Sequence, residues 1–457
     1  MPMLNDTIVA ISTPIGEGGI GIVRLSGPDA LAILRRVLRR GKKGNAVPAI
    51  EPYRLHYGRV VDPATGETLD EVLASYMRAP HSYTREDVVE INCHGGIVPL
   101  RRILLLALRQ GARLAEPGEF TLRAFLNGRL DLAQAEAVLD IIRAQTDASL
   151  RMALSQLEGR LSDRVCAVRQ DLVAALAFLE ASIDFAEDDV PYEDITPTLA
   201  RAEAALEQLL AQSSEGIIYR QGVRVAIVGR PNVGKSSLLN ALLRTSRAIV
   251  APIPGTTRDT LEETLNLRGI PLCLVDTAGI AASEDLVTQL GIERSRQALQ
   301  QADLVLFVVD RSEALTSADE AIAALLSGKT VILVLNKADL PAVAVTDGLL
   351  PRASRVTVSA LTGEGIDTLE QAMEEAIFAG QVRTSDTPLV SNPRHQAILH
   401  RALEHVRAAQ ETHARGMPED FVSIDLAAAV MALGDITGES ATEDLLDTIF
   451  ERFCVGK

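Results

Sequence analysis

The chain has 457 residues, carries a formal net charge of −16 and contains only 3% aromatic residues. Because this length exceeds what one hydrophobic core usually serves, we expect about three domains of roughly 100 to 200 residues each. The acidic balance excludes a surface that binds nucleic acid throughout, since Lys and Arg supply most nonspecific affinity for phosphates, so any RNA contact is local or comes from a partner.

Membrane and secretory classes are not expected either. No stretch approaches the ~20 apolar residues of a membrane span, and the N-terminus lacks the basic region, apolar core and cleavage site of a signal peptide. The four cysteines have no close pairs, which excludes the usual zinc spacing and argues against a disulfide framework. We therefore expect a cytoplasmic protein without membrane contact.

Residues 1–122 predict an α+β domain. Short apolar runs in this region have the composition of strands, and one longer apolar stretch has helical spacing. The expected strands cover residues 7–11, 21–25, 54–57 and 88–92, and the expected helix covers residues 99–108.

Two separate segments predict one helical domain. In residues 123–217, β-branched runs disappear and apolar residues recur every three to four positions. In residues 381–457, Pro393 and Pro418 punctuate two more helical stretches, and Gly416 stands where a helix would stop. An α/β domain is expected between them, over residues 218–380.

A phosphate-binding loop opens this central segment. The sequence Gly229-Arg-Pro-Asn-Val-Gly-Lys-Ser236 follows a strand-like run and precedes helix-forming residues. In this spacing Gly229 and Gly234 let backbone N–H groups turn toward phosphates, Lys235 reaches the β/γ oxygens, and the Ser236 hydroxyl ligates Mg²⁺. The expected nucleotide contacts here are Asn232, Val233, Gly234, Lys235, Ser236 and Ser237.

Two further segments fit the γ-phosphate and its metal ion. Gly255-Thr-Thr-Arg-Asp259 lies in a Pro-rich stretch and places the Thr257 hydroxyl on Mg²⁺. Asp276-Thr-Ala-Gly279 ends an apolar run with an acid suited to the outer shell of Mg²⁺ and a glycine N–H for the γ-phosphate. The expected contacts are Ala251, Thr256, Thr257, Asp276, Thr277, Ala278 and Gly279.

The last two segments select the base. After an apolar run, Asn336-Lys-Ala-Asp339 offers a carboxylate that accepts hydrogen bonds from the N1–H and amine of guanine, a donor pair that adenine lacks. Ser359-Ala360 brings a backbone N–H to the guanine carbonyl after another short strand. Together the five segments predict a GTPase, with base contacts from Asn336, Lys337, Asp339, Ser359 and Ala360.

The residue that orients the attacking water is missing from its usual position. Ile280 stands directly after Asp-Thr-Ala-Gly, where many GTPases have glutamine, and it has no hydrogen-bonding group. Arg258 is a candidate arginine finger, with a structural role as its alternative. Asp276 and Arg258 are therefore the candidate catalytic residues from the GTPase segments themselves.

Motifs on both sides of the GTPase set resemble those of the MnmE (also called TrmE) tRNA-modification GTPases, over essentially the whole chain. The resemblance implies an N-terminal domain similar to folate-binding domains, a helical bundle and an inserted Ras-like P-loop GTPase domain. The motifs are Asp6-Thr-Ile-Val-Ala10, Gly21-Ile-Val-Arg-Leu-Ser-Gly27, Ser82-Tyr-Thr-Arg-Glu-Asp87, His94-Gly-Gly96, Pro117-Gly-Glu-Phe120, Arg123-Ala-Phe-Leu-Asn127, Leu130-Asp-Leu-Ala-Gln-Ala-Glu136 and Phe453-Cys-Val-Gly-Lys457.

The family implies that a potassium ion replaces the arginine finger. A cation that bridges phosphate oxygens offsets the charge that develops on the leaving group. The family also has a water-orienting glutamate at the position of Thr288, so this chain departs from it. Either Glu284 or Asp285 takes over, or Thr288 binds the water weakly and hydrolysis is slow. The implied K⁺ ligands are Asn232 and Thr256, with the backbone carbonyls of Ala251 and Ile253.

The family further implies that a tetrahydrofolate derivative, 5-formyl- or methylene-tetrahydrofolate, binds the N-terminal domain. Glu90 suits the N–H groups of the pterin, and the cationic residues suit the glutamyl carboxylates. The family has a lysine at the position of Arg129. Arginine keeps the positive charge but presents it in a different geometry. Cys454 is a possible modification-site cysteine, and a tail cysteine without a role is the alternative. The implied folate residues are Arg24, Glu90, Arg129 and Lys457.

Two functions follow as expectations. The resemblance implies a homodimeric enzyme that works with a flavin-dependent partner of the MnmG (GidA) type to attach an aminomethyl or carboxymethylaminomethyl group at C5 of the wobble uridine of certain tRNAs. GTP hydrolysis would drive the conformational change, through loops at 252–259 and 280–291 that order with the γ-phosphate. The alternative is a GTP-dependent assembly switch of the ribosome-associated type, against which the folate-like domain and the C-terminal motif argue.

Overall fold

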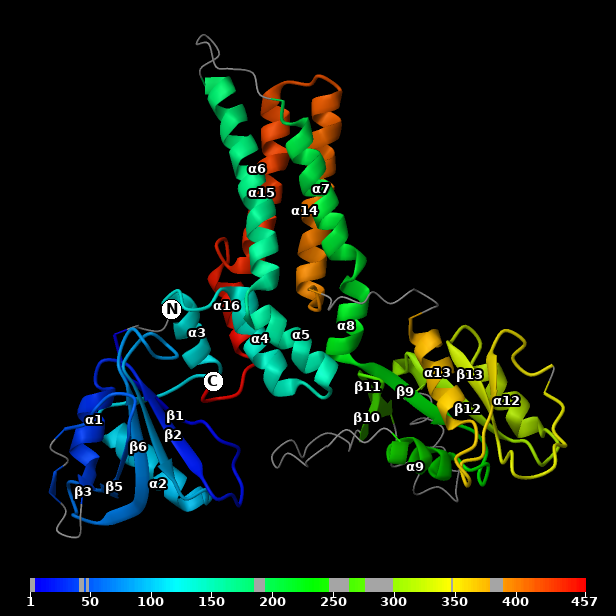
Figure 1. Cartoon of the computed structure of the whole chain (residues 1–457), viewed down its shortest axis with the longest axis horizontal. Coiled ribbons are helices and arrows are strands. Elements are labelled where there is room, and N and C mark those ends of the chain that lie inside the picture. Colours follow the sequence, from blue (N-terminus) through cyan, green and yellow to red (C-terminus); the bar gives the residue numbers. More distant parts are fainter. Residues whose placement is uncertain are drawn as a thin grey trace.

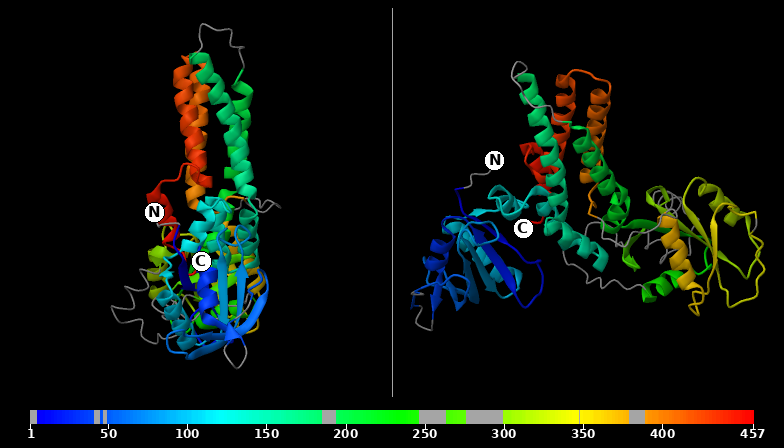
Figure 2. Two further views of the ribbon diagram at one scale, coloured as in Figure 1. Left: turned by 90° about the vertical axis from the view of Figure 1, so that its left-hand side faces the viewer. Right: turned by 45° about the horizontal axis from the view of Figure 1, so that its top comes forward.

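A computed structural model describes residues 5–40, 45–46, 49–184, 194–245, 263–275, 299–346, 348–378 and 389–457. Figure 1 shows an α+β domain at one side, an α/β domain at the other, and a helical bundle that rises between them. In both views of Figure 2 the upper part of the bundle lies beyond the two sheets. Within the described ranges, no helix combines the length and apolar character needed to cross a membrane.

The α+β domain is built on an eight-stranded sheet in the order β4-β3-β5-β6-β7-β2-β1-β8. Helices α1 and α2 bury their apolar residues against one face of the sheet, where they form a single core with the inward-facing strand residues. The elements are β1 (Ile8–Ile11), β2 (Gly21–Ser26), α1 (Ala30–Val37), β3 (Leu38–Arg40), β4 (Asn45–Ala46), β5 (Leu55–Val61), β6 (Thr68–Met77), β7 (Val88–Cys93), α2 (Ile97–Arg109) and β8 (Arg113–Leu114).

The expected strands and helix of this domain are confirmed, but β6, α1 and the short strands β3, β4 and β8 were not expected. β6 contains polar residues such as Asp70 and Glu71, and it buries only every second residue near its end. Antiparallel pairing of β2 with β7 sets the register that matters most, because it places Arg24 directly opposite Glu90. The sheet therefore presents this pair on one face.

The helical domain contains four long helices, α6, α7, α14 and α15, whose inner faces form one apolar core. α14 begins at Pro393, with Asn392 as its N-cap, and Gly416 has a φ of +66° directly after the helix. The helix starts expected at Pro393 and Pro418 and the helix stop expected at Gly416 are thus confirmed. The helices after the α+β sheet are α3 (Glu119–Leu126), α4 (Leu132–Arg143), α5 (Asp147–Leu157), α6 (Arg160–Asp184), α7 (Thr196–Ala211), α8 (Ser213–Gln221), α14 (Pro393–Ala414), α15 (Glu419–Thr437) and α16 (Glu443–Phe450), and the boundary expected between residues 122 and 123 lies within α3.

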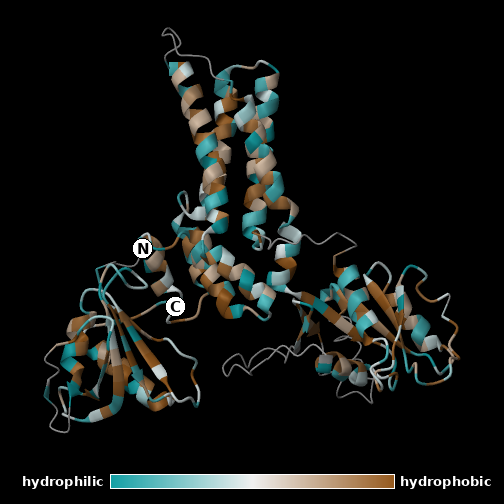
Figure 3. Cartoon of the chain, in the orientation of Figure 1, coloured by the Kyte–Doolittle hydropathy of each residue, from teal (hydrophilic) through white to brown (hydrophobic). Residues whose placement is uncertain are grey.

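The α/β domain has a six-stranded sheet in the order β10-β11-β9-β12-β13-β14, in which only β10 runs antiparallel to its neighbour. The inner strands β9, β11, β12 and β13 are mainly apolar, as expected for strands covered on both faces, and brown predominates in this sheet in Figure 3. The elements are β9 (Val223–Val228), α9 (Lys235–Thr245), β10 (Glu263–Leu267), β11 (Ile270–Val275), β12 (Leu304–Asp310), α12 (Ser317–Leu325), β13 (Val331–Asn336), β14 (Ser354–Thr357) and α13 (Ile366–Ile377).

The chain leaves the helical domain through α8 and returns to it directly before α14. A Cβ on Gly216 of α8 would lie only 2.1 Å from the carbonyl oxygen of Val390, so the outgoing and returning segments touch. The inserted domain also contacts the foot of the bundle, because the Thr146 hydroxyl that caps α5 donates to the carbonyl of Gly269 at 2.8 Å. Both ends of the insertion therefore lie close together.

Candidate functional site

The expected phosphate loop joins β9 to α9 at the carboxyl edge of the sheet, where ligands bind in folds of this kind. Gly229 and Gly234 have φ values of +155° and +96°, and Asn232 has a φ of +65°. A Cβ on Gly229 would lie 2.3 Å from the carbonyl oxygen of Val308, and one on Gly234 would lie 2.2 Å from Nδ2 of Asn336. The loop is thus pressed against the ends of β12 and β13, in a curved backbone of the kind that cradles anions.

Lys235 lies in the first turn of α9, and the loop itself holds its ammonium group. Nζ donates to the carbonyl oxygens of Gly229 at 2.9 Å and Arg230 at 2.7 Å. Burial lowers the pKa of Lys235 from its ordinary value, because removing water disfavours the charged form. An anion beside Nζ would offset that penalty, so this arrangement fits a phosphate group.

The segments expected to recognise the base meet at the ends of β13 and β14. Asn336 is 2% exposed; its Nδ2 donates to the carbonyl of Val233 at 2.8 Å, and its Oδ1 accepts from the backbone N–H of Ala360 at 3.0 Å. The Ser359 hydroxyl donates to Oδ1 of Asp339 at 2.5 Å. Asn336 therefore ties the phosphate loop to the base segment, while Ser359 orients the exposed carboxylate of Asp339.

One charged residue at this edge of the sheet was not predicted from the sequence. Asp310 ends β12, and its carboxylate lies 2.5 Å from Nζ of Lys337. Burial alone would raise the pKa of Asp310, but hydrogen bonds from Lys337 and Ser312 outweigh burial and lower the pKa. Lys337, the partner in this ion pair, has a φ of +66°, a conformation that costs backbone energy in a residue other than glycine. The signal that could have revealed it is an acid at the end of a fully apolar run.

Several expected residues lie outside the part of the chain that the structure describes. They comprise the residues before and within the Thr-Thr loop, the Asp-Thr-Ala-Gly segment and the candidates for catalysis. Ser236 and Ser237 are described, and both are exposed in the first turn of α9. The residues outside the description are Ala251, Ile253, Thr256, Thr257, Arg258, Asp276, Thr277, Ala278, Gly279, Glu284, Asp285 and Thr288.

A second cluster forms where the C-terminal tail crosses the α+β domain (Figure 1). Nε and Nη2 of Arg24 each lie 2.8 Å from Oε1 of Glu90, and Nη1 donates to the carbonyl of Gly456 at 3.2 Å. Val455 also forms an isolated β-bridge with Pro117. The end of the chain is thereby held against the strand that carries Arg24.

Aromatic rings support the two arginines of this cluster. The guanidinium of Arg129 lies 4.7 Å from the ring centroid of Tyr83 and donates to the Tyr83 carbonyl at 3.1 Å. The guanidinium of Arg24 lies 5.8 Å from the ring centroid of Phe120. Such cations are attracted by the ring quadrupole. Tyr83 and Phe120 belong to motifs seen in the sequence, but distance along the chain hides their partners there.

Lys457 completes the cluster. Burial, and after it the positive charge of Arg24, lowers the pKa of Lys457. The Tyr83 hydroxyl lies 2.9 Å from the hydroxyl of Thr121, the residue after Phe120, so the rings beside Arg129 and Arg24 lie in one region. Arg24 and Lys457 therefore lie near the carboxylate of Glu90, a set that suits an anionic ligand with N–H donors. Cys454, three residues before the chain end, is exposed.

Comparison with known proteins assigns nearly the whole chain to one family. The family model described as GTP-binding protein TrmE N-terminus matches residues 7–129, and the model described as MnmE helical domain matches residues 132–454. The tRNA modification GTPase MnmE of Chloroflexus aurantiacus is 53% identical over 99% of this chain and 100% of that protein. The same enzyme of Desulforamulus reducens is 48% identical over 100% of both chains.

Solved structures of GTP-binding proteins are similar to part of the chain. Era in complex with MgGDPNP and a segment of 16S ribosomal RNA is 32% identical, over 40% of this chain and 66% of that chain, with a TM-score of 0.28. The family models, together with the two sheets and the bundle, confirm the fold class predicted from the sequence.

Proposed function

The chain belongs to the MnmE family of tRNA modification GTPases, and from this premise we propose its cofactors, its partner and the reaction it serves. It is a GTP hydrolase that takes part in tRNA modification, like its relatives across their full lengths. We propose that hydrolysis depends on potassium, and that the cytoplasmic homodimer acts with a flavin-dependent partner of the MnmG type. Together they install an aminomethyl or carboxymethylaminomethyl group at C5 of the wobble uridine of certain tRNAs.

The observation that carries the proposal is the contact between the C-terminal tail and the α+β domain. Glu90 can accept hydrogen bonds from pterin N–H groups, while Arg24, Lys457 and Arg129 suit the glutamyl carboxylates. Arg24 now neutralises Glu90 at 2.8 Å, so a ligand that binds both residues exchanges one ion pair for two. When bound, a tetrahydrofolate derivative would supply the one-carbon unit, and the exposed Cys454 lies in the same tail.

At the nucleotide, the desolvated ammonium of Lys235 supports a role on the β/γ phosphates, and the oriented carboxylate of Asp339 supports recognition of guanine. A bound cation beside the phosphates would offset the charge of the leaving group. Asn232 fits such a site because its side chain is exposed on the curved loop. We assign Mg²⁺ to Ser236 and Thr257, and K⁺ to Asn232, Thr256 and the carbonyls of Ala251 and Ile253.

The attacking water has no glutamine or glutamate at the positions that related GTPases use. Because Ile280 and Thr288 occupy those positions, we assign orientation of the water to Glu284 or Asp285. Weak binding of the water by Thr288 is the alternative, and it predicts slower hydrolysis. Asp276 acts through the outer shell of Mg²⁺, and Arg258 has a structural role in the loop.

The test is GTP hydrolysis at matched ionic strength in potassium and in sodium. We expect the rate to be at least about tenfold higher in potassium, since a cation at this place substitutes for an arginine finger. Asn232→Ala should abolish the difference, whereas Asn240→Ala, which removes an exposed asparagine of α9 outside the loop, should keep it. Equal rates in both salts for the parent protein would overturn the proposed potassium dependence.

A further inference from the structure

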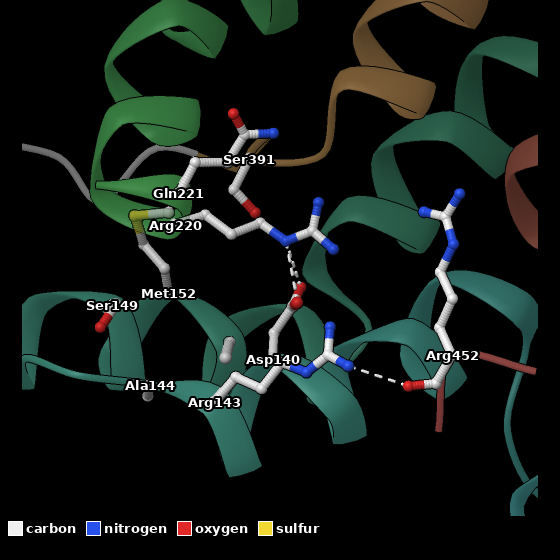
Figure 4. A pocket seen from close by; sticks show the side chains of 10 residues that line it. Asp140, Arg143, Ala144, Ser149, Met152, Arg220, Gln221, Ser391 and Arg452 are labelled. Carbon is white, nitrogen blue, oxygen red and sulfur yellow. Dashed lines mark hydrogen bonds and ion pairs between the residues drawn. The ribbon is translucent and has the colours of Figure 1, made fainter. Parts of the chain in front are cut away.

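A cavity of about 250 Å³ lies at the foot of the helical bundle (Figure 4). Its walls come from α4 and α5, from the end of α8, from Ser391 before α14, and from Arg452 after α16. The cavity therefore touches the outgoing and returning connections of the inserted domain. It also touches the residue that directly precedes the C-terminal motif, in a part of the molecule that neither the nucleotide site nor the C-terminal cluster includes.

The cavity has an excess of positive charge. Its lining contains Arg143, Arg220 and Arg452 but only one acid, Asp140. Nε of Arg220 lies 2.8 Å from both carboxylate oxygens of Asp140, so these two charges neutralise each other. Arg143 and Arg452 carry the excess, in a chain whose net charge is −16.

Both remaining guanidinium groups have donors available for a ligand. Arg143 uses Nη2 to donate to the backbone carbonyl of Arg452 at 2.9 Å, which leaves most of its five N–H donors. The side chain of Arg452 forms no hydrogen bond or ion pair with any residue in the described ranges. Figure 4 shows the guanidinium groups of Arg220 and Arg143 on either side of the Asp140 carboxylate.

The shape of the cavity limits what it can hold. Met152 and Ala153 form a buried apolar floor, whereas Arg143 and Arg452 are exposed, so the cavity opens to solvent beside the arginines. Its volume is below the roughly 300 to 1,000 Å³ of sites that enclose a drug-sized ligand. It has room for one phosphate group and part of its carrier, with the rest of the ligand outside.

We propose that this cavity binds one backbone phosphate of the tRNA substrate through Arg143 and Arg452. The planar fork of arginine matches phosphate oxygens in two-pronged hydrogen bonds. An acidic chain repels RNA over most of its surface, so a phosphate approaches where positive charge is concentrated. This inference rests on the proposed function, because it takes tRNA as the substrate.

The position of the cavity gives this contact a consequence beyond affinity. A phosphate bound there lies beside Gln221 and Ser391, on the two connections to the GTPase domain, and beside Arg452, next to the C-terminal motif. If tRNA binding favours one placement of these connections, the affinities for GTP and for tRNA are coupled, and this coupling of affinities is reciprocal.

The test is tRNA binding by the full-length parent, by Arg143→Gln and by Arg452→Gln, measured by fluorescence anisotropy with an unmodified tRNA transcript over a series of KCl concentrations. Arg151→Gln is the matched control, because Arg151 lies on α5 beside the cavity floor, is exposed, and does not line the cavity. Each cavity variant should bind about tenfold more weakly. The slope of log K against log salt should fall by about one, and the control should match the parent.

A parallel titration of each protein with inorganic phosphate, followed by melting temperature, separates the two sources of phosphate. Affinities and slopes in both cavity variants that equal those of the parent would overturn the proposal. So would phosphate stabilisation that both cavity variants abolish while tRNA binding stays unchanged, because the ligand would then be a free anion. Because these binding measurements need neither folate nor the partner, a failure of the proposed modification reaction would not change their outcome.

Discussion

At the scale of single residues, one glycine sets the shape of the nucleotide site. Gly234 has a φ of +96°, and a Cβ there would lie 2.2 Å from Nδ2 of Asn336. That nitrogen donates to the carbonyl of Val233, and the other end of the amide holds the N–H of Ala360. The phosphate loop and the base segment therefore share one amide, which can move away from a side chain at position 234 only by losing these hydrogen bonds.

We predict that Gly234→Ala lowers the affinity for GTP and GDP by at least about tenfold. A non-glycine residue in this conformation costs on the order of 1–3 kcal/mol, and the methyl group displaces the Asn336 amide from both of its partners. Calorimetric titration with GDP measures the loss. Gly348→Ala is the control, because nothing lies within 4 Å of its Cβ position. An affinity for GDP equal to that of the parent would show that the loop does not need this contact.

Which site residues were predictable depends on how far their partners lie along the chain. The phosphate loop is contiguous, so its turn and its lysine can be read from the spacing of residues 229–236. The contact from Asn336 to Val233 spans 103 positions, and the ring of Tyr83 lies under Arg129 from 46 positions away. Such pairings depend on the packing of whole elements, and a single sequence carries no direct record of them.

At the scale of elements, a buried ionic cluster joins α4 to the start of α14. The carboxylate of Glu136 accepts from Nε and Nη2 of Arg394 at 3.1 and 2.8 Å and lies 2.6 Å from Nε2 of His395, which is 0% exposed. Burial would raise the pKa of Glu136, but the charge and hydrogen bond of His395, with those of Arg394, outweigh it and hold the pKa well below its usual range. The cluster fixes the point where the chain re-enters the bundle.

We predict that Glu136→Gln lowers the free energy of unfolding by about 3–5 kcal/mol at pH 7, because it leaves the largely buried guanidinium of Arg394 without its counter-charge. A carboxyl with a depressed pKa stabilises the fold above its unfolded value and loses that contribution as the pH falls. The difference between parent and variant should therefore shrink as the pH drops below the ordinary value of 4.5.

Thermal melts of parent and variant between pH 7 and pH 3 measure this dependence. Glu158→Gln is the control, since Glu158 pairs with Arg160 through two exposed side chains and such pairs contribute little. A difference between the melting temperatures of parent and Glu136→Gln that stays constant over the whole pH range would contradict the assignment.

Elements were predictable where burial follows a simple period. The bundle helices and strands β9, β11 and β13 have clear apolar patterns, and the capping signals at Asn392 and Gly416 mark helix ends. β6 was not predicted from the sequence, because it lies between β5 and β7 and buries few of its residues toward the core. Its place follows from pairing with its neighbours, which local composition does not encode.

At the scale of the whole molecule, the GTPase domain is an insertion whose two ends meet on the bundle. The apolar core of the bundle contains only residues from the helical segments on either side of it. Besides the contact between Gly216 and Val390, Nε2 of Gln396 donates to the Ser213 hydroxyl at 2.7 Å. Only a few residues of the helical segments, among them Met152 and Tyr219, pack into the core of the inserted sheet. The bundle therefore has most of its stabilising contacts without the insertion.

We predict that replacing residues 222–389 by a Gly/Ser linker of about six residues leaves the rest of the chain folded. From Gly216 to the end of α8 the helix rises about 7.5 Å, and such a linker spans more than twice that length. Exposing Met152 and Tyr219 costs about 1.5–3 kcal/mol each at most, so we expect a cooperative melt at a lower temperature with the helicity of the bundle retained. Circular dichroism measures the helicity and the melt of the shortened protein. Binding of 5-formyltetrahydrofolate by the same protein would also argue against a pure assembly switch. A non-cooperative melt would instead mean that the bundle needs the GTPase domain to fold.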